Sequence, residues 1–139
     1  MKIVIDTSVW ISALIIKESQ VREILRLVFI GKLHPQMGEA LYREYESVMK
    51  RKKIQKLTVL SHCEQEELFC AFLNNCQWNG MYYSWRPNLK DEDDNFLVEL
   101  AVASNAKVIL TYNEKDFKES ELLFNHKVIT PENFIKEMQ

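Results

Sequence analysis

The segment KIVIDTSVW, residues 2–10, contains the clearest indication of the fold of this chain. Its first four residues form a β-branched run without polar alternation, which is typical of a parallel strand that helices cover on both faces. Asp6 ends the strand, and Thr7 or Ser8 can cap a helix that begins near Val9. These residues predict the opening strand and helix of a parallel α/β fold.

The rest of the chain continues this alternation of strands and helices. We expect strands near residues 33–37, 107–111 and 126–130, and helices over 19–31, 38–53, 63–75, from the acids at 91–94 to about 105, and 131–138. Residues 76–90 form the longest irregular stretch. Such an alternation predicts a central parallel sheet flanked by helices, a three-layer α/β fold.

The composition describes an ordinary globular chain. Its 139 residues suit one domain, residues 1–139, and 47% hydrophobic with 27% charged residues predict a well-packed core. The net charge of −2 provides no general attraction to nucleic acid or membrane, so any nucleic-acid contact must be local. No apolar run approaches the roughly 20 residues that span a bilayer, and we expect a cytoplasmic protein with no membrane partner.

Ligands of parallel α/β sheets gather beyond the carboxyl ends of the strands, and Asp6 lies at such an end. A carboxylate at the rim of the core is costly to desolvate unless it is paired or bound to a metal. Asp6 could also simply cap the helix that follows it.

A second acid comes from the helix expected over residues 38–53. Its buried stripe consists of Leu41, Tyr45 and Val48, and a projection at 100° per residue places Glu44 about 60° from Leu41, at the edge of that stripe. Glu44 can instead extend outward or pair with a lysine.

Four consecutive acids, residues 91–94, precede the next helix, whose expected inner face contains Leu97, Leu100, Ala101 and Ser104. The same projection turns Asp93 and Asp94 toward that face, whereas Glu92, Asn95 and Glu99 point away. Asp91 suits the N-cap. Favourable placement of acids in a first helical turn explains part of this run, and the geometry does not choose between Asp93 and Asp94.

The segment LTYNEKDF, residues 110–117, follows another strand with three oxygen-bearing side chains, those of Thr111, Asn113 and Asp116. Each residue is also common in turns. Carboxylates that converge repel one another, and a hard divalent cation such as Mg²⁺ or Mn²⁺ removes this repulsion. The chemistry that such a site predicts is hydrolysis of a phosphodiester by a metal-activated water.

These segments resemble the PIN-domain family of metal-dependent ribonucleases. The resemblance rests on VIDTSVWISALI, EALYREYESVM, KDEDDNFLVELAVASNAKVILTYNEKDF and VITPENFIKEM, in order and over nearly the whole chain. It implies an Mg²⁺- or Mn²⁺-dependent endoribonuclease. It also implies that the first three acids of the family's site are Asp6, Glu44 and Asp94, with Asp91 as an accessory acid. The polar positions that line the family's pocket correspond to Ser8 and Thr111.

The chain departs from the family pattern at the fourth acid, where Asn113 stands in place of the aspartate that many members have. Asparagine can ligate through its carbonyl oxygen but brings no charge, so a second metal should bind more weakly, and Asp116 can supply the missing carboxylate. The chain is also similar to VapC-type toxins, which implies a homodimer and an antitoxin partner.

Contacts to an RNA substrate are expected from two segments. The basic segment KRKKIQK, residues 50–56, includes Lys52 and Lys53, which can contact phosphates or simply form a solvated helix end. Arg86 and several aromatic residues lie within 78–87, where bases can stack, although such aromatics more often cover a core or form an interface.

Two rival interpretations remain open at this point. A catalytically weak or inactive PIN-like module that binds RNA or protein is favoured by the uncharged Asn113. A phosphoacceptor domain is disfavoured because Ser8 stands two residues after Asp6, where a phosphatase of the aspartate-nucleophile class would have a second aspartate.

Overall fold

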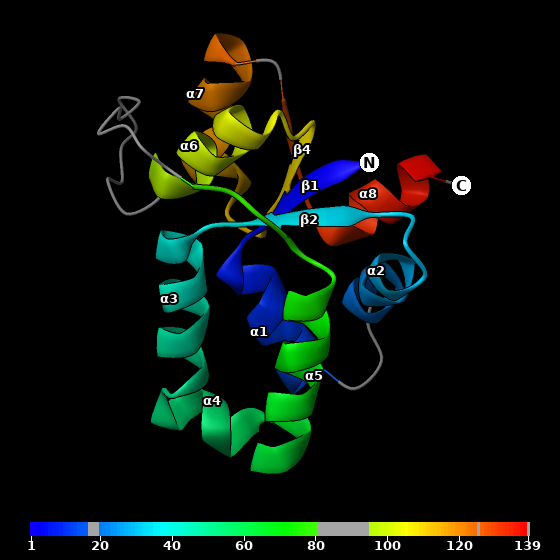
Figure 1. Ribbon diagram of the computed structural model, residues 1–139, viewed down its shortest axis with the longest axis vertical. Helices are drawn as coiled ribbons and strands as arrows, with labels where there is room; N and C mark the ends of the chain where they lie inside the picture. The colour runs from blue at the N-terminus through cyan, green and yellow to red at the C-terminus, as the bar shows by residue number, and fades with distance from the viewer. Residues whose placement is uncertain (17–19, 81–94, 125, 139) are drawn as a thin grey trace.

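The computed structural model describes residues 1–16, 20–80, 95–124 and 126–138. Within them the chain forms a parallel sheet flanked by helices, as the sequence predicts (Figure 1). The strands are β1 (Lys2–Ile5), β2 (His34–Met37), β3 (Gln77–Trp78), β4 (Val108–Leu110) and β5 (Lys127–Ile129). The helices are α1 (Thr7–Ile15), α2 (Gln20–Phe29), α3 (Glu39–Met49), α4 (Lys52–Leu57), α5 (His62–Asn74), α6 (Asn95–Ser104), α7 (Glu114–Leu123) and α8 (Pro131–Met138).

The five strands lie in the order β3-β2-β1-β4-β5, and each neighbouring pair is parallel. In Figure 1, α6 and α7 lie on one side of the sheet, and α1, α3 and α5 lie on the other. β1 is the central strand, and Ile3, Val4 and Ile5 are all buried. The unbroken apolar run of β1 therefore reflects its cover on both faces.

Aromatic rings join three of the helices on the α1 side of the sheet. Trp10 of α1 makes an edge-to-face contact with Tyr45 of α3, with ring centroids 5.7 Å apart, and lies 4.9 Å from the ring of Phe72 in α5. All three rings are buried. Paired aromatic rings add about 0.5–1.5 kcal/mol beyond area burial, so this cluster fixes α3 and α5 against the first helix.

Several boundaries differ from those that the sequence predicts. Helix α1 begins at Thr7, with Asp6 in the N-cap position, rather than near Val9. The helix expected over residues 38–53 is divided, because Arg51 adopts an extended backbone (φ −63°, ψ 133°) between α3 and α4. This corner allows Ile54 to enter the core, where its side chain is 7% exposed.

Two elements are absent from the sequence prediction. Strand β3 forms at the start of the stretch that was expected to be irregular, and it pairs with β2 through Met37 and Trp78. Helix α7 covers residues where no helix was expected, and its Phe117 is fully buried. Both depend on tertiary partners that local periodicity does not reveal.

The structure contains no helix in its described ranges with the length and apolar character needed to cross a membrane.

Gly31 provides a test of how α2 ends. Its φ of +85° lies in the left-handed region, and a Cβ built there meets no atom within 4 Å, so a side chain would cost only backbone strain. We expect Gly31→Ala to lower the free energy of unfolding by about 1–2 kcal/mol. Gly31→Asn should lose less, since asparagine tolerates this conformation. Urea denaturation measures both, with Lys32→Ala as the exposed control. Equal stability of the alanine variant and the control would contradict this account.

Candidate active site at the carboxyl edge of the sheet

Asp6 lies at the carboxyl end of the central strand, and its residue is only 7% exposed. Its backbone N–H donates to the carbonyl oxygen of Leu110 at 2.9 Å, which continues the pairing of β1 with β4 by one residue. A carboxylate at this depth requires hydrogen-bond donors or a cation to replace the water that it loses.

Three hydroxyl groups surround this carboxylate. Thr111 Oγ1 and Ser8 Oγ donate to Oδ2 of Asp6, at 2.7 and 3.0 Å, and Thr7 Oγ1 lies 3.4 Å from Oδ1. Although Asp6 occupies the N-cap position of α1, its side chain makes no capping hydrogen bond. The interpretation of Asp6 as a simple helix cap is therefore wrong for its carboxylate, and Oδ1 keeps most of its capacity to bind a ligand.

The loop after β4 is fixed to this group by further hydrogen bonds. The N–H of Tyr112 donates to Ser8 Oγ at 3.2 Å, and the N–H of Asn113 donates to Thr111 Oγ1 at 3.0 Å. The Tyr112 hydroxyl donates to Glu132 of α8 at 2.7 Å, and partial burial together with this bond raises the pKa of Tyr112 to about 12. The structure thus unites Asp6, Ser8 and Thr111 and positions the backbone of Asn113 beside them.

Helix α3 is tied to the same edge through Tyr45. This side chain is fully buried, and its hydroxyl donates to the carbonyl oxygen of Ile5, the residue before Asp6. Burial, with smaller contributions from Cys76 and the Asp6 carboxylate, raises the pKa of Tyr45 well above its usual value. The helical pattern predicts Tyr45 only as a core residue, because nothing in it distinguishes an aromatic side chain that also donates a hydrogen bond.

Glu44 precedes Tyr45 and lies at the boundary of the core, as the helical projection predicts. Its side chain is 39% exposed, and its Oε1 lies 3.9 Å from Nη2 of Arg51. Leu41, Tyr45 and Val48 are all buried, which confirms the stripe from which that projection started.

The remaining predicted residues are more dispersed. Asn113 is exposed, and Asp116 is an exposed acid in the first turn of α7. Lys52 and Lys53 are exposed on α4, which Figure 1 shows at the end of α3 that lies away from the sheet. Four further candidates, Arg86, Asp91, Asp93 and Asp94, fall outside the described residues.

Helix α6 packs against β1 and α3, with Leu97, Leu100, Ala101 and Ser104 buried as predicted. Glu99 was expected to point away from the core, and this was wrong, because it is only 7% exposed. The adjoining Val98 is also fully buried. A projection onto one inner face fails for α6 because neighbouring elements cover more than one side of this helix.

The oxygen donors at this edge suit a hard cation such as Mg²⁺ or Mn²⁺, since carboxylate, amide and hydroxyl oxygens are the ligands it prefers. Asp6 fits such a role, because its residue is buried, its side chain makes no capping hydrogen bond, and its carboxylate is contacted by the hydroxyl groups of Thr7, Ser8 and Thr111. Within the described ranges, no three Asp, Glu, His or Cys side chains converge as a metal site. The acids at residues 91–94 come directly before the first described residue of α6.

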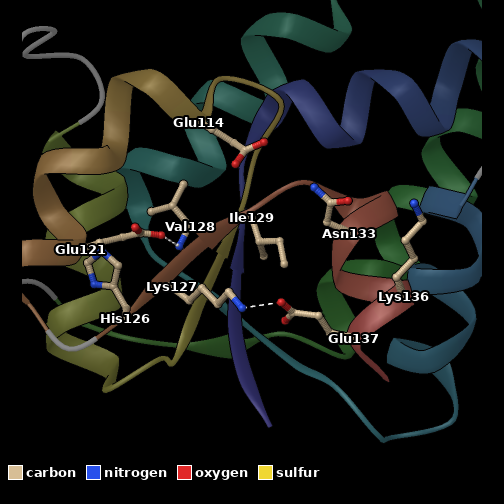
Figure 2. Close-up of a pocket in the computed structure, with 9 residues that line it drawn as sticks. All are labelled: Glu114, Glu121, His126, Lys127, Val128, Ile129, Asn133, Lys136 and Glu137. Carbon is tan, nitrogen blue, oxygen red and sulfur yellow. Dashed lines mark hydrogen bonds and ion pairs between the residues drawn. The ribbon is translucent and has the colours of Figure 1, made fainter. Parts of the chain in front are cut away.

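A cavity of about 620 Å³ lies elsewhere, along β5 between α7 and α8 (Figure 2). Its wall carries both charges, with Lys127 paired to Glu137 across it and Glu121 accepting a hydrogen bond from the N–H of Val128. Burial lowers the pKa of His126 in the same wall. None of the residues lining this cavity belongs to the group around Asp6, so the cavity and the candidate active site are separate features.

Comparisons with known proteins agree with the parallel α/β fold described above. A family model described as PIN domain matches residues 2–115. Among solved structures, the crystal structure of VapBC2 from Rickettsia felis bound to a DNA fragment from their promoter is similar, with a TM-score of 0.59 and 16% sequence identity. The match covers 92% of this chain and 97% of that one, and at this identity it shows a shared fold. No curated protein sequence matches the chain.

The buried hydroxyl of Tyr45 predicts a specific loss of stability in alkali. Because the pKa of Tyr45 is higher in the folded than in the unfolded chain, its contribution is complete below about pH 10 and is lost as pH rises further. Between pH 9 and 11 we expect wild type to lose about 1 kcal/mol more than Tyr45→Phe. Urea denaturation at each pH measures this difference. Parallel stability curves for the two proteins would show that Tyr45 does not have this raised pKa.

Proposed function

The chain belongs to the PIN domain family, and on this premise we propose that it is a metal-dependent endoribonuclease, the toxin of a toxin–antitoxin pair. The observation that carries the proposal is the state of Asp6. Its buried carboxylate lies at the carboxyl end of the central strand, is held by three hydroxyl groups and does not cap α1. An acid in this setting is available to bind a metal ion.

We assign the metal to Asp6, Asp94, Asn113 and Asp116, with Asp91 as an accessory acid. When bound, Mg²⁺ or Mn²⁺ would lower the pKa of a water molecule and stabilise the charge that develops on the scissile phosphate. Thr111 and Ser8 hold the Asp6 carboxylate in one orientation through their hydrogen bonds to Oδ2. The hydroxyl donors therefore preorganise the ligand before the metal arrives.

Glu44 is the acid best placed to take part in proton transfer. The bond from Tyr45 to Ile5 fixes α3 beside the end of β1, and the carboxylate of the adjacent Glu44 is 39% exposed. We propose that this carboxylate accepts a proton from the attacking water. The substrate is proposed to be RNA, with Lys52, Lys53 and Arg86 as contacts farther along the strand. The fold shared with the VapBC2 structure supports an antitoxin partner, and we also propose that the chain forms a homodimer.

A catalytically weak module that binds RNA or protein is the second candidate. It is favoured by Asn113, which contributes no charge where a carboxylate would strengthen metal binding. Metal-independent RNA binding without cleavage would support this alternative.

The first test is Mn²⁺-dependent cleavage of a single-stranded RNA. Asp6→Asn and Asp94→Asn should each reduce the cleavage rate by at least 100-fold, because each removes a charged metal ligand. Glu44→Gln should also reduce it. The matched controls are Glu39→Gln, also on α3, and Glu92→Gln, from the same run of acids, and both should retain the wild-type rate. Undiminished cleavage by Asp6→Asn would overturn the proposed mechanism.

A second test restores the missing charge. Asn113→Asp should raise the affinity for Mn²⁺ and increase the cleavage rate at limiting metal, because a carboxylate binds the cation more strongly than an amide does. Isothermal titration calorimetry and the Mn²⁺ dependence of the rate measure the two effects. The exposed Asn133→Asp on α8 is the control. An Mn²⁺ affinity in Asn113→Asp equal to that of wild type and of the Asn133→Asp control would place residue 113 outside the metal site.

A further inference from the structure

If the chain is the nuclease proposed above, its acidic site must also bind RNA, which is a polyanion, so a cation near the site must face the substrate. The inference that follows rests on that proposed function. Net charge does not provide the attraction, since the whole chain carries −2. The segment of residues 50–56 contains five cations, and the structure distinguishes one of them, Arg51, from the four lysines.

Arg51 is the member of this segment whose side chain reaches an acid of the candidate site. Its Nη2 lies 3.9 Å from Oε1 of Glu44. Arg51 lies two residues beyond the end of α3, in the corner before α4, and its side chain extends back from there toward Glu44. For Lys50, Lys52 and Lys53, the described residues offer no acidic partner within ion-pair distance.

The ion pair between Arg51 and Glu44 is weak enough to exchange partners. The distance is long, and the side chains are 58% and 39% exposed, respectively. Exposed pairs of this kind contribute about 0–1 kcal/mol. A guanidinium has five N–H donors, so Arg51 keeps most of its hydrogen-bonding capacity while it is paired.

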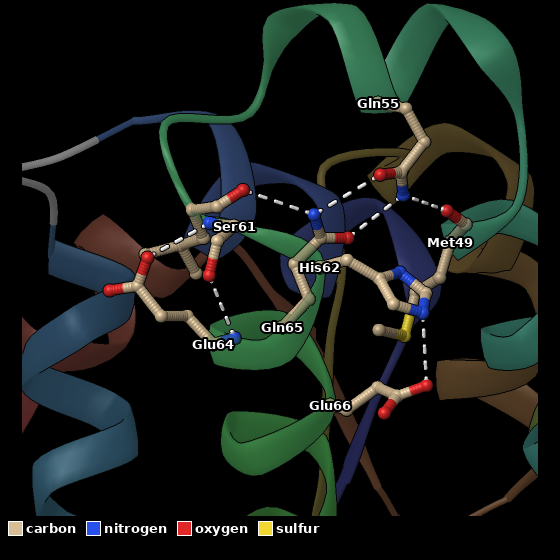
Figure 3. A network of polar contacts seen from close by, with 8 residues as sticks. Met49, Gln55, Ser61, His62, Glu64, Gln65 and Glu66 are labelled. Carbon is tan, nitrogen blue, oxygen red and sulfur yellow. Dashed lines mark hydrogen bonds and ion pairs between the residues drawn. The ribbon is translucent and has the colours of Figure 1, made fainter.

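The backbone that carries Arg51 is nevertheless fixed. Its N–H donates to the carbonyl oxygen of Val48, and its carbonyl oxygen accepts from the N–H of Gln55 at 3.1 Å. The Gln55 side chain donates to the carbonyl oxygen of Met49 and exchanges two hydrogen bonds with the amide of Gln65, which is 2% exposed (Figure 3). This network holds the corner between α3 and α4 against α5, so little backbone ordering remains to be lost when Arg51 binds a ligand.

From this geometry we propose that Arg51 binds a backbone phosphate of the RNA next to the scissile bond. Glu44 holds the guanidinium beside the site in the free protein. Because this ion pair is weak, a phosphate can replace Glu44 as the partner of Arg51, and a planar guanidinium binds a phosphate through two parallel N–H···O bonds. The basic segment thus contributes one cation at the reacting centre, while Lys52 and Lys53 act farther along the strand.

The test measures binding separately from cleavage. A fluorescein-labelled single-stranded RNA is titrated with protein in EDTA, and anisotropy gives the Kd between 25 and 200 mM KCl. Arg51→Gln should raise the Kd about tenfold, equivalent to about 1.4 kcal/mol, and reduce the slope of log K against log salt by about 0.7. Arg51→Lys should keep the slope and lose only part of the affinity, because the charge remains but the paired donors do not.

Arg43→Gln is the matched control, because Arg43 pairs with Glu39 on α3 and its substitution removes the same charge as Arg51→Gln does. It should change the Kd less than twofold and leave the salt slope unchanged. In a Glu44→Gln background, where Arg51 has no partner to hold it back, the loss caused by Arg51→Gln should be larger than in wild type. Thermal unfolding of Arg51→Gln should match wild type within about 2 °C, because the exposed pair contributes little to stability.

The inference is overturned if Arg51→Gln and Arg43→Gln give the same Kd and salt slope, or if the wild-type protein shows no RNA binding at 25 mM KCl. If the wild-type protein cleaves RNA and Arg51→Gln binds RNA with the wild-type Kd, the role of Arg51 is wrong and the nuclease function stands. If Arg51→Gln weakens binding but the wild-type protein does not cleave RNA, the nuclease function is wrong and the role of Arg51 in binding stands.

Discussion

The hydrogen bonds to the Asp6 carboxylate are the interaction on which the candidate site depends. A carboxylate that is 7% exposed would be strongly unfavourable at the end of a central strand without donors around it. Thr111 and Ser8 supply those donors from the loop after β4 and from α1. The same bonds that make the buried acid tolerable therefore also join the two strand ends that form the site.

The parallel sheet explains why these residues meet. Asp6 and Thr111 are 105 positions apart in the chain, yet β1 and β4 are neighbours and their carboxyl ends lie at one edge. Tyr45 adds α3 to this edge by donating to the carbonyl oxygen of Ile5. Hydrogen bonds from the buried Thr111 and Tyr45 and the partly buried Ser8 thus fix three separate elements near one carboxylate, so that this part of the site is ordered before any ligand binds.

Acidic and basic side chains near the site occupy different places and have different proposed roles. The Asp6 carboxylate and its hydroxyl donors lie at the sheet edge, while the basic segment lies at the corner between α3 and α4, where Arg51 pairs with Glu44. A mixed arrangement of this kind suits a reaction in which an anionic substrate must approach a metal held by carboxylates. The cavity along β5 carries its own mixed charges and has no part in this arrangement.

The parallel α/β fold could be predicted from the sequence, because strands as apolar as KIVI must be covered on both faces and the alternation with helices leaves few other arrangements. The sequence also predicts that Asp6 follows a buried parallel strand and that Glu44 borders the buried stripe of α3, since strand ends and helical periodicity are local properties.

The hydrogen bonds and burial of these residues depend instead on tertiary contacts. The structure shows that the Asp6 carboxylate accepts hydroxyl bonds instead of capping α1, that Tyr45 donates to the end of β1, and that Arg51 breaks the helix expected over residues 38–53. The burial of Glu99 and the formation of α7 likewise follow from neighbours distant in the chain. Hydrogen-bond partners and burial are set by what packs against a residue, and a single element's periodicity contains no record of its neighbours.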